Sequence, residues 1–181
     1  NAQFTYYQLR SQRELTNVQA DSSVAIAQAN LSAAQAGVNK SESVYQATLT
    51  QGKSSVAQAQ ANLAGAQSQA RQAEVDFNQT KVQYERMLGL QRQGFVSTAD
   101  VQDAYAEVLS SHAAVQARKA DVKAAETMVD NAREQAKKDA VSAEADIQTS
   151  RHGAESARAT VAEAQAGTSR SESFQQQLRA Q

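Results

Sequence analysis

The feature that most constrains this chain is the absence of proline from all 181 of its residues. Proline is the strongest helix breaker, at about 3 kcal/mol in a helix interior. Alanine, the strongest helix former, occupies 37 positions. Because alanine contributes little apolar surface, too few large apolar side chains remain for a globular core at this length. The sequence therefore predicts long helices, and it argues against β-rich, α/β and disulfide-framed folds.

Apolar residues recur at every seventh position of the first half, and a second series of mostly small residues lies three positions further on. This spacing is the a/d seam of a coiled coil. The large series consists of Leu49, Val56, Leu63, Ala70, Phe77 and Tyr84, and the second series of Gly52, Ala59, Ala66, Ala73, Thr80 and Met87.

The second half has the same heptad spacing, with valine as the recurring residue. A window this long rarely keeps such a period by chance, so we expect a second coiled-coil helix. The series runs through Val101, Val108, Val115, Val122 and Val129 and continues with Ala136 and Ala143.

An internal repeat lies within the first half. The segment SVAIAQANLSAAQ at 23–35 matches SVAQAQANLAGAQ at 55–67 in ten of thirteen places, at an offset of 32 residues. Since 32 is four heptads plus four, the seam through Val38 and Tyr45 must shift phase before Leu49. Such a stutter unwinds the supercoil locally, and we interpret the repeat as a duplication that lengthened a helix.

One central segment breaks the helical pattern. Gly94 suits the left-handed position just past a helix end. Ser97 can cap the next helix, and Asp100 at its third position favours the positive end of the helix dipole. We therefore predict one domain with a first helix over 1–92, a turn over 93–97 and a second helix over 98–181.

The predicted fold is all-α, a long antiparallel two-helix coiled-coil hairpin. This register should bring Met87 near Val101, and Phe77 near Leu109 or His112. The rival is a four-helix bundle that folds again near Gly52 and Gly153.

Sites for catalysis, metals or cofactors are not expected. His112 and His152 stand 40 residues apart, and neither lies in a metal-ligand pattern. No serine lies in a nucleophile elbow, and no glycine-rich phosphate loop occurs. Eighteen basic and nineteen acidic residues are interspersed, which argues against a nucleic-acid partner. We therefore predict a protein that is not an enzyme.

Two groups of apolar residues stand apart from the seam. Phe4, Tyr6 and Tyr7 form an aromatic start, interpreted either as a plug between the helix ends or as a contact with a neighbouring domain. The second group lies at the predicted turn, where a two-stranded coil has no further layer to pack on, and suggests a docking site or a closure of the hairpin on itself. It comprises Leu88, Leu90, Phe95 and Val96, flanked by Arg86 and Arg92.

These turn residues resemble a known family. Arg86, Leu90 and Ser97 reproduce the R-x3-L-x6-S signature at the hairpin tip of the HlyD-type membrane fusion proteins, which are periplasmic adaptor proteins. The segment YERMLGLQRQGFVSTADVQDAYAEV at 84–108 resembles that family's turn and early second helix. YQATLTQGKSSVAQAQANL at 45–63 resembles its first helix.

The resemblance implies a role in transport across the Gram-negative envelope. It predicts a periplasmic adaptor that links an inner-membrane transporter of unassigned class to a TolC-like outer-membrane channel, in a tripartite efflux pump or a type I secretion system. Such hairpins commonly assemble as hexamers, and the adaptor is anchored to the inner membrane by a segment that this sequence lacks. The chain would then be an excised hairpin domain. The implied partner-binding residues are Arg86, Leu90, Gly94, Phe95, Val96 and Ser97.

A coiled-coil scaffold or filament protein unrelated to transport is the alternative, because the heptads alone would serve it equally well.

Overall fold

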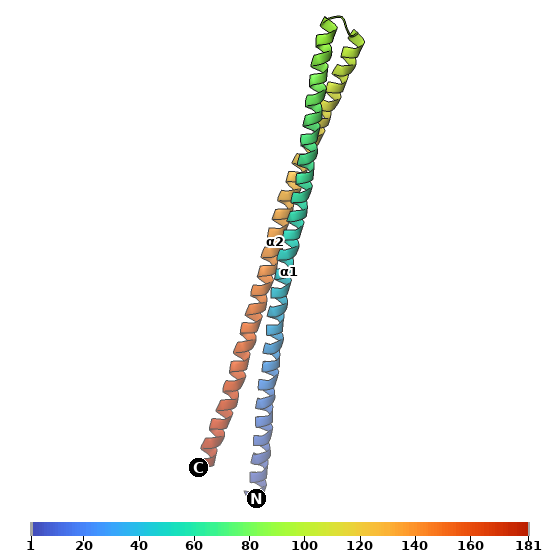
Figure 1. Cartoon of the computed structure of the whole chain (residues 1–181). Coiled ribbons are helices and arrows are strands. Elements are labelled where there is room, and N and C mark those ends of the chain that lie inside the picture. Colours follow the sequence, from blue (N-terminus) through green and yellow to red (C-terminus); the bar gives the residue numbers. More distant parts are fainter. Residues whose placement is uncertain (1, 181) are drawn as a thin grey trace. The chain divides into compact units, whose positions relative to one another are not determined.

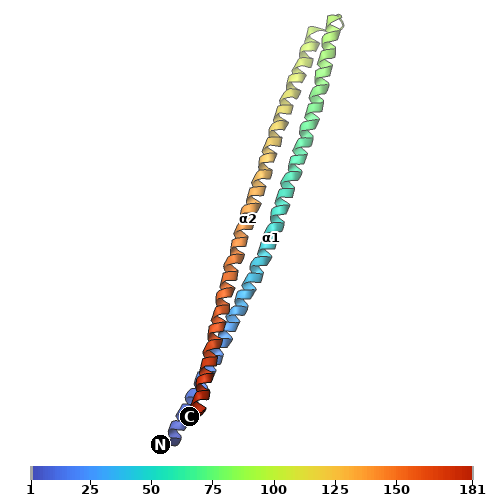
Figure 2. The same cartoon turned by 90° about the vertical axis from the view of Figure 1, so that its left-hand side faces the viewer.

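A computed structural model describes the backbone of residues 2–180 and the side chains of residues 7, 8, 10–173 and 176. Two helices account for nearly all of it: α1 spans Ala2–Arg92 and α2 spans Thr98–Ala180. They run antiparallel beside each other, as Figures 1 and 2 show from two directions. The fold is therefore the predicted all-α two-helix hairpin. Neither helix is interrupted at Gly52 or Gly153, so the chain does not fold again there.

The chain divides into two compact units, each of which pairs one stretch of α1 with one stretch of α2. The turn unit spans Leu49–Asp139 and contains the connection between the helices. The terminal unit combines residues up to Thr48 with residues from Ala140 onward.

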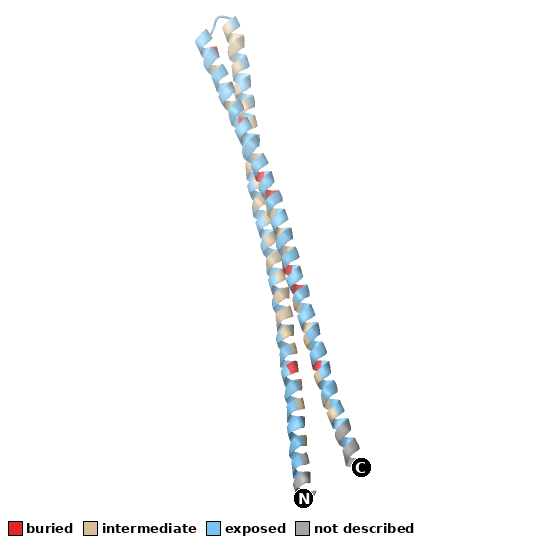
Figure 3. Ribbon diagram, turned by 180° about the vertical axis from the view of Figure 1, so that it is seen from behind, coloured by how far each residue is buried: buried red, intermediate tan, exposed pale blue. Residues whose placement is uncertain are grey.

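The seam holds a thin core. The buried residues are alanines and β-branched side chains, and within the described residues no side chain is less than 2% exposed. Exposed surface dominates both helices in Figure 3. Several of the buried residues, among them Ala70, Val115 and Val129, belong to the predicted series. Alanine and valine permit close helix packing but cover little area per layer. The core consists of Ala27, Ala70, Val101, Val115, Ala125, Val129, Ala143, Ile147 and Val161.

Each helix carries one break in its heptad spacing, and both breaks fall at the boundary between the units. In α1, Ser41, Tyr45 and Leu49 are half-buried and stand at two successive intervals of four residues, which is the predicted stutter. In α2 the same double interval runs from Ala132 through Ala136 to Ala140. The sequence pattern does not reveal this second break, because Ala143 continues the valine series and hides the change of phase.

Aromatic contacts define the register of the turn unit. The rings of Phe77 and His112 lie 5.3 Å apart between centroids, which confirms one of the expected pairings. One heptad nearer the turn, the rings of Tyr84 and Tyr105 lie 5.4 Å apart. Seven residues forward in α1 thus correspond to seven residues back in α2.

Each unit contains the same pattern of polar contacts between α1 and α2. In the turn unit, Glu74 forms a salt bridge with Lys119 at 2.9 Å. In the terminal unit, Glu42 forms one with Arg151, also at 2.9 Å. These partners are 32 residues apart in both helices, the offset of the internal repeat. The hydroxyl pairs Thr80–Ser111 and Ser41–Ser150, each at 2.8 Å, likewise share one register. The same cross-helix arrangement therefore recurs in each unit.

Candidate interaction site at the turn

The C-terminus of α1 is closed by a left-handed glycine. Gly94 has a φ of 78°, and its N–H donates to the Gln91 carbonyl oxygen at 2.9 Å. The Phe95 N–H donates to the Leu90 carbonyl oxygen at 3.0 Å. These two bonds form a Schellman motif, which satisfies carbonyls that the helix end would leave unpaired. The glycine is required here because other residues adopt a positive φ only at a cost.

The N-terminus of α2 is capped reciprocally. Ser97 Oγ accepts a hydrogen bond from the Asp100 N–H at 3.1 Å, while Asp100 Oδ2 accepts from the Ser97 N–H and hydroxyl at 2.8 and 2.7 Å. This is a capping box with aspartate at the third position. The Ser97 hydroxyl, and then its N–H, lower the pKa of the Asp100 carboxyl below its ordinary value. Ser97 therefore caps the helix as predicted, and its hydroxyl proton is used within the chain.

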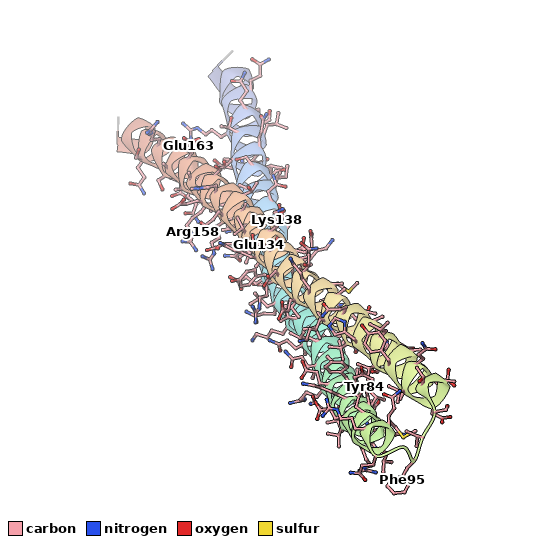
Figure 4. The ribbon with its side chains drawn as sticks, turned by 90° about the horizontal axis from the view of Figure 1, so that it is seen from above. Tyr84, Phe95, Glu134, Lys138, Arg158 and Glu163 are labelled. Carbon is pink, nitrogen blue, oxygen red and sulfur yellow. The ribbon has the colours of Figure 1, made fainter. Side chains whose placement is uncertain are left out.

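The capped ends hold the apolar residues of the turn in defined positions. Phe95 is 74% exposed, and its ring projects from the turn in Figure 4. Leu90 and Val96 are half-buried. Because the backbone on both sides of Phe95 is fixed by hydrogen bonds, its ring is presented at little further cost in conformational entropy.

Two arginines flank the turn on α1. Arg86 and Arg92 are both exposed, and neither forms a salt bridge within the described part of the chain. Arg92 lies in the last turn of α1, where a positive charge is favoured by the helix dipole. A guanidinium without an internal partner can donate several hydrogen bonds to another molecule.

The turn thus gathers the residues singled out by the sequence within one short segment of the turn unit. Arg86 and Phe95 are exposed, Leu90 and Val96 are partly covered, and Gly94 and Ser97 support the backbone. Leu90, one of the partner-binding residues that the resemblance implies, is only partly accessible. An exposed aromatic ring beside cationic side chains can contact a protein surface.

The titratable residues of the described chain are spread along the two helices. Among the described residues, no group of three or more His, Asp or Glu side chains is arranged to hold a metal ion. The pKa of the Asp100 carboxyl is lowered, and the cause is the helix cap. No described helix is long and apolar enough to cross a membrane.

Aromatic residues also lie outside the turn. Tyr84 and Phe77 extend the turn unit's seam, and their contacts with α2 follow the predicted heptad period. At the start of the chain, the side chains of Phe4 and Tyr6 lie outside the described residues, and Tyr7 is exposed.

Comparison with known proteins produced no match of this chain to a family model, a curated protein or a solved structure.

Proposed function

We propose that this chain is the helical hairpin of a periplasmic adaptor of the HlyD type. In this role it links an inner-membrane transporter to a TolC-like outer-membrane channel, in a tripartite efflux pump or a type I secretion system. It acts in the periplasm as part of a homo-oligomer, with six copies the expected number. It performs no catalysis, and the turn contacts the channel.

The observation that carries the proposal is the coincidence of a sequence signature with the turn. Arg86, Leu90 and Ser97, whose spacing resembles the adaptor signature, all lie within two helical turns of the α1–α2 connection. A signature of three residues in an alanine-rich helix has modest weight alone. Its location at the single connection between the two helices supports a role at the end of a hairpin.

The composition of the hairpin is compatible with the same role. Its outer faces carry mostly polar side chains, while Phe95 stands exposed where the helices are joined. A coiled-coil scaffold would need the seam but would have no use for an exposed aromatic ring flanked by unpaired arginines. The scaffold remains the alternative that the experiment must separate.

The experiment measures export by cells that carry the full-length protein with changes at the turn. We expect Arg86→Ala and Leu90→Ala to abolish export at wild-type expression. Truncating a central interface residue costs on the order of 1–3 kcal/mol per copy, and this loss is repeated around a ring. Helicity and thermal unfolding should stay close to wild type for Arg86→Ala, because its side chain is exposed.

Matched controls separate docking from general damage. Arg71→Ala removes another exposed arginine of α1, and Leu63→Ala truncates a half-buried leucine of the seam. Arg71→Ala should export normally. Leu63→Ala should lower the stability of the hairpin and reduce export less than the turn variants do. Normal export by both turn variants would refute the adaptor assignment and favour the scaffold.

A further inference from the structure

A groove runs between α1 and α2 on one side of the terminal unit. Its volume is about 610 Å³, within the range of about 300–1,000 Å³ typical of small-molecule sites. The half-buried seam residues Leu31, Val38 and Ala154 contribute apolar surface to it. Three amide side chains, those of Gln35, Asn39 and Gln148, also line the groove, and none donates or accepts a side-chain hydrogen bond within the described residues.

The charged residues of the groove come from α2. One terminal nitrogen of the Arg151 guanidinium donates a hydrogen bond to Glu42 Oε1 at 2.9 Å. His152 Nδ1 lies 3.7 Å from Glu155 Oε2. Arg158 lines the same groove, is exposed, and has no ion-pair partner in the part of the chain that the structure describes (Figure 4 labels it on α2).

The register explains why Arg158 lacks a counter-ion. Glu74 pairs with Lys119 and Glu42 pairs with Arg151, each in a salt bridge of 2.9 Å. One heptad beyond Glu42–Arg151, the residue opposite Arg158 is Gln35, and both line the groove. An amide therefore stands where the two register-equivalent positions carry a carboxylate.

We propose that this groove binds an anionic amphiphile, whose oxyanion head takes the position of the missing carboxylate beside Arg158. The guanidinium fork suits the oxygens of a phosphate or carboxylate, and it forms two parallel hydrogen bonds with them. The amides of Gln35 and Gln148 offer further donors, and the apolar body lies along Leu31 and Val38. This inference uses no residue of the turn and is independent of the proposed adaptor role.

The test is thermal unfolding of the full chain, followed by circular dichroism at constant ionic strength. The probes are n-octyl phosphate, inorganic phosphate as the head alone, and n-octyl glucoside as the body alone, with the amphiphiles below their micelle concentrations. A ligand that binds the folded chain raises the Tm by mass action. We expect n-octyl phosphate to raise it by about 2–4 °C, and the other two probes to raise it less.

Two substitutions examine the position of the head. Arg158→Gln should abolish the shift by n-octyl phosphate. Gln35→Glu should also abolish it while raising the Tm of the free protein, since the chain then supplies its own carboxylate. Gln28→Glu adds the same charge one heptad away, opposite Gln165, and should keep the shift.

Four results would contradict the proposed site in the groove. The proposal is wrong if n-octyl phosphate produces no shift, or if Arg158→Gln responds like wild type. An equal shift with inorganic phosphate would reduce the site to one for a free anion and refute the amphiphile. An equal shift with n-octyl glucoside would refute the role of the charge.

Discussion

Gly52 of α1 lies directly against Ala136 of α2, so close that a Cβ on Gly52 would stand 2.8 Å from the Ala136 Cβ. Real Cβ atoms do not approach one another to this distance, and the clashing atom is attached to helix backbone rather than to a flexible side chain. The glycine is therefore required by the approach of the two helices within the turn unit, although its own backbone is an ordinary helix.

This contact predicts opposite effects for two similar substitutions. Gly52→Ala should destabilise the hairpin, because the overpacking cost of about 1–3 kcal/mol exceeds the gain of about 1 kcal/mol in helix propensity. Gly65→Ala should stabilise it by about 1 kcal/mol, since an added Cβ there meets nothing within 4 Å. Urea unfolding of both variants measures the difference.

A compensating exchange provides the control for Gly52. The double variant Gly52→Ala with Ala136→Gly moves the methyl group from one helix to the other, and it should recover most of the lost stability. If Gly52→Ala is as stable as Gly65→Ala, the helices do not approach as closely as the structure indicates.

The cap of α2 predicts a defined pH dependence. The folded-state pKa of Asp100 is lowered by its bonds from Ser97, so the stabilisation is complete above the ordinary pKa of an aspartate. It is lost as the pH falls through the lowered value. The Tm difference between wild type and Asp100→Asn should therefore be largest at pH 6 and shrink at pH 2. A difference that grows on acidification would contradict this assignment.

Ser97→Ala tests the same cap from the other side. It should cost about 1 kcal/mol of stability and return the pKa of Asp100 toward its ordinary value, as followed by NMR titration. An unchanged Asp100 titration would mean that the Ser97 hydroxyl is not a cause of the lowered pKa.

Phe95 predicts a separation of stability from function. Its side chain is 74% exposed, so Phe95→Ala should change the free energy of unfolding by less than about 0.5 kcal/mol. Export should nevertheless fall if the turn docks on a channel. Phe77→Ala is the contrast, because that ring packs on His112 and its loss should lower the Tm. Normal export by a well-folded Phe95→Ala protein would remove Phe95 from the interface.

The shared register of the polar contacts predicts that the hairpin can be shortened in one step. Deleting residues 43–74 together with 119–150 joins Glu42 to Val75 and Arg118 to Arg151. Glu42 and Arg151 then occupy the places of Glu74 and Lys119, whose 2.9 Å pairing they reproduce. The heptad phase continues across both junctions, so this variant should remain fully helical and unfold in a single transition.

Deleting 43–74 alone is the matched comparison. It leaves α2 with a stretch that has no partner, and single alanine-rich helices without packing are marginal in water. We expect a second transition at lower temperature, visible by circular dichroism. Identical melting of the single and double deletions would show that cross-helix register does not govern stability.

Local chemistry was enough to predict the helices and the turn. The period from Leu49 to Tyr84 identifies a seam because burial depends on which face a residue occupies, and a helix repeats its faces regularly. Gly94 and Ser97 mark the ends of α1 and α2, because each satisfies backbone groups only a few residues away. Such interactions are short in sequence and can be identified without knowledge of the partner helix.

The contacts across the seam depended on the tertiary structure. Gly52 and Ala136, or Gln35 and Arg158, come together only when one register is chosen. Registers one heptad apart would bury similar rows of alanine and valine, so the period alone barely distinguishes them. The second break, at Ala136–Ala140, could not be recognised because Ala143 continues the valine series across it. The cap geometry decided one further point, since it directs the Ser97 hydroxyl to Asp100, and this use depends on side-chain placement that residue spacing alone does not specify.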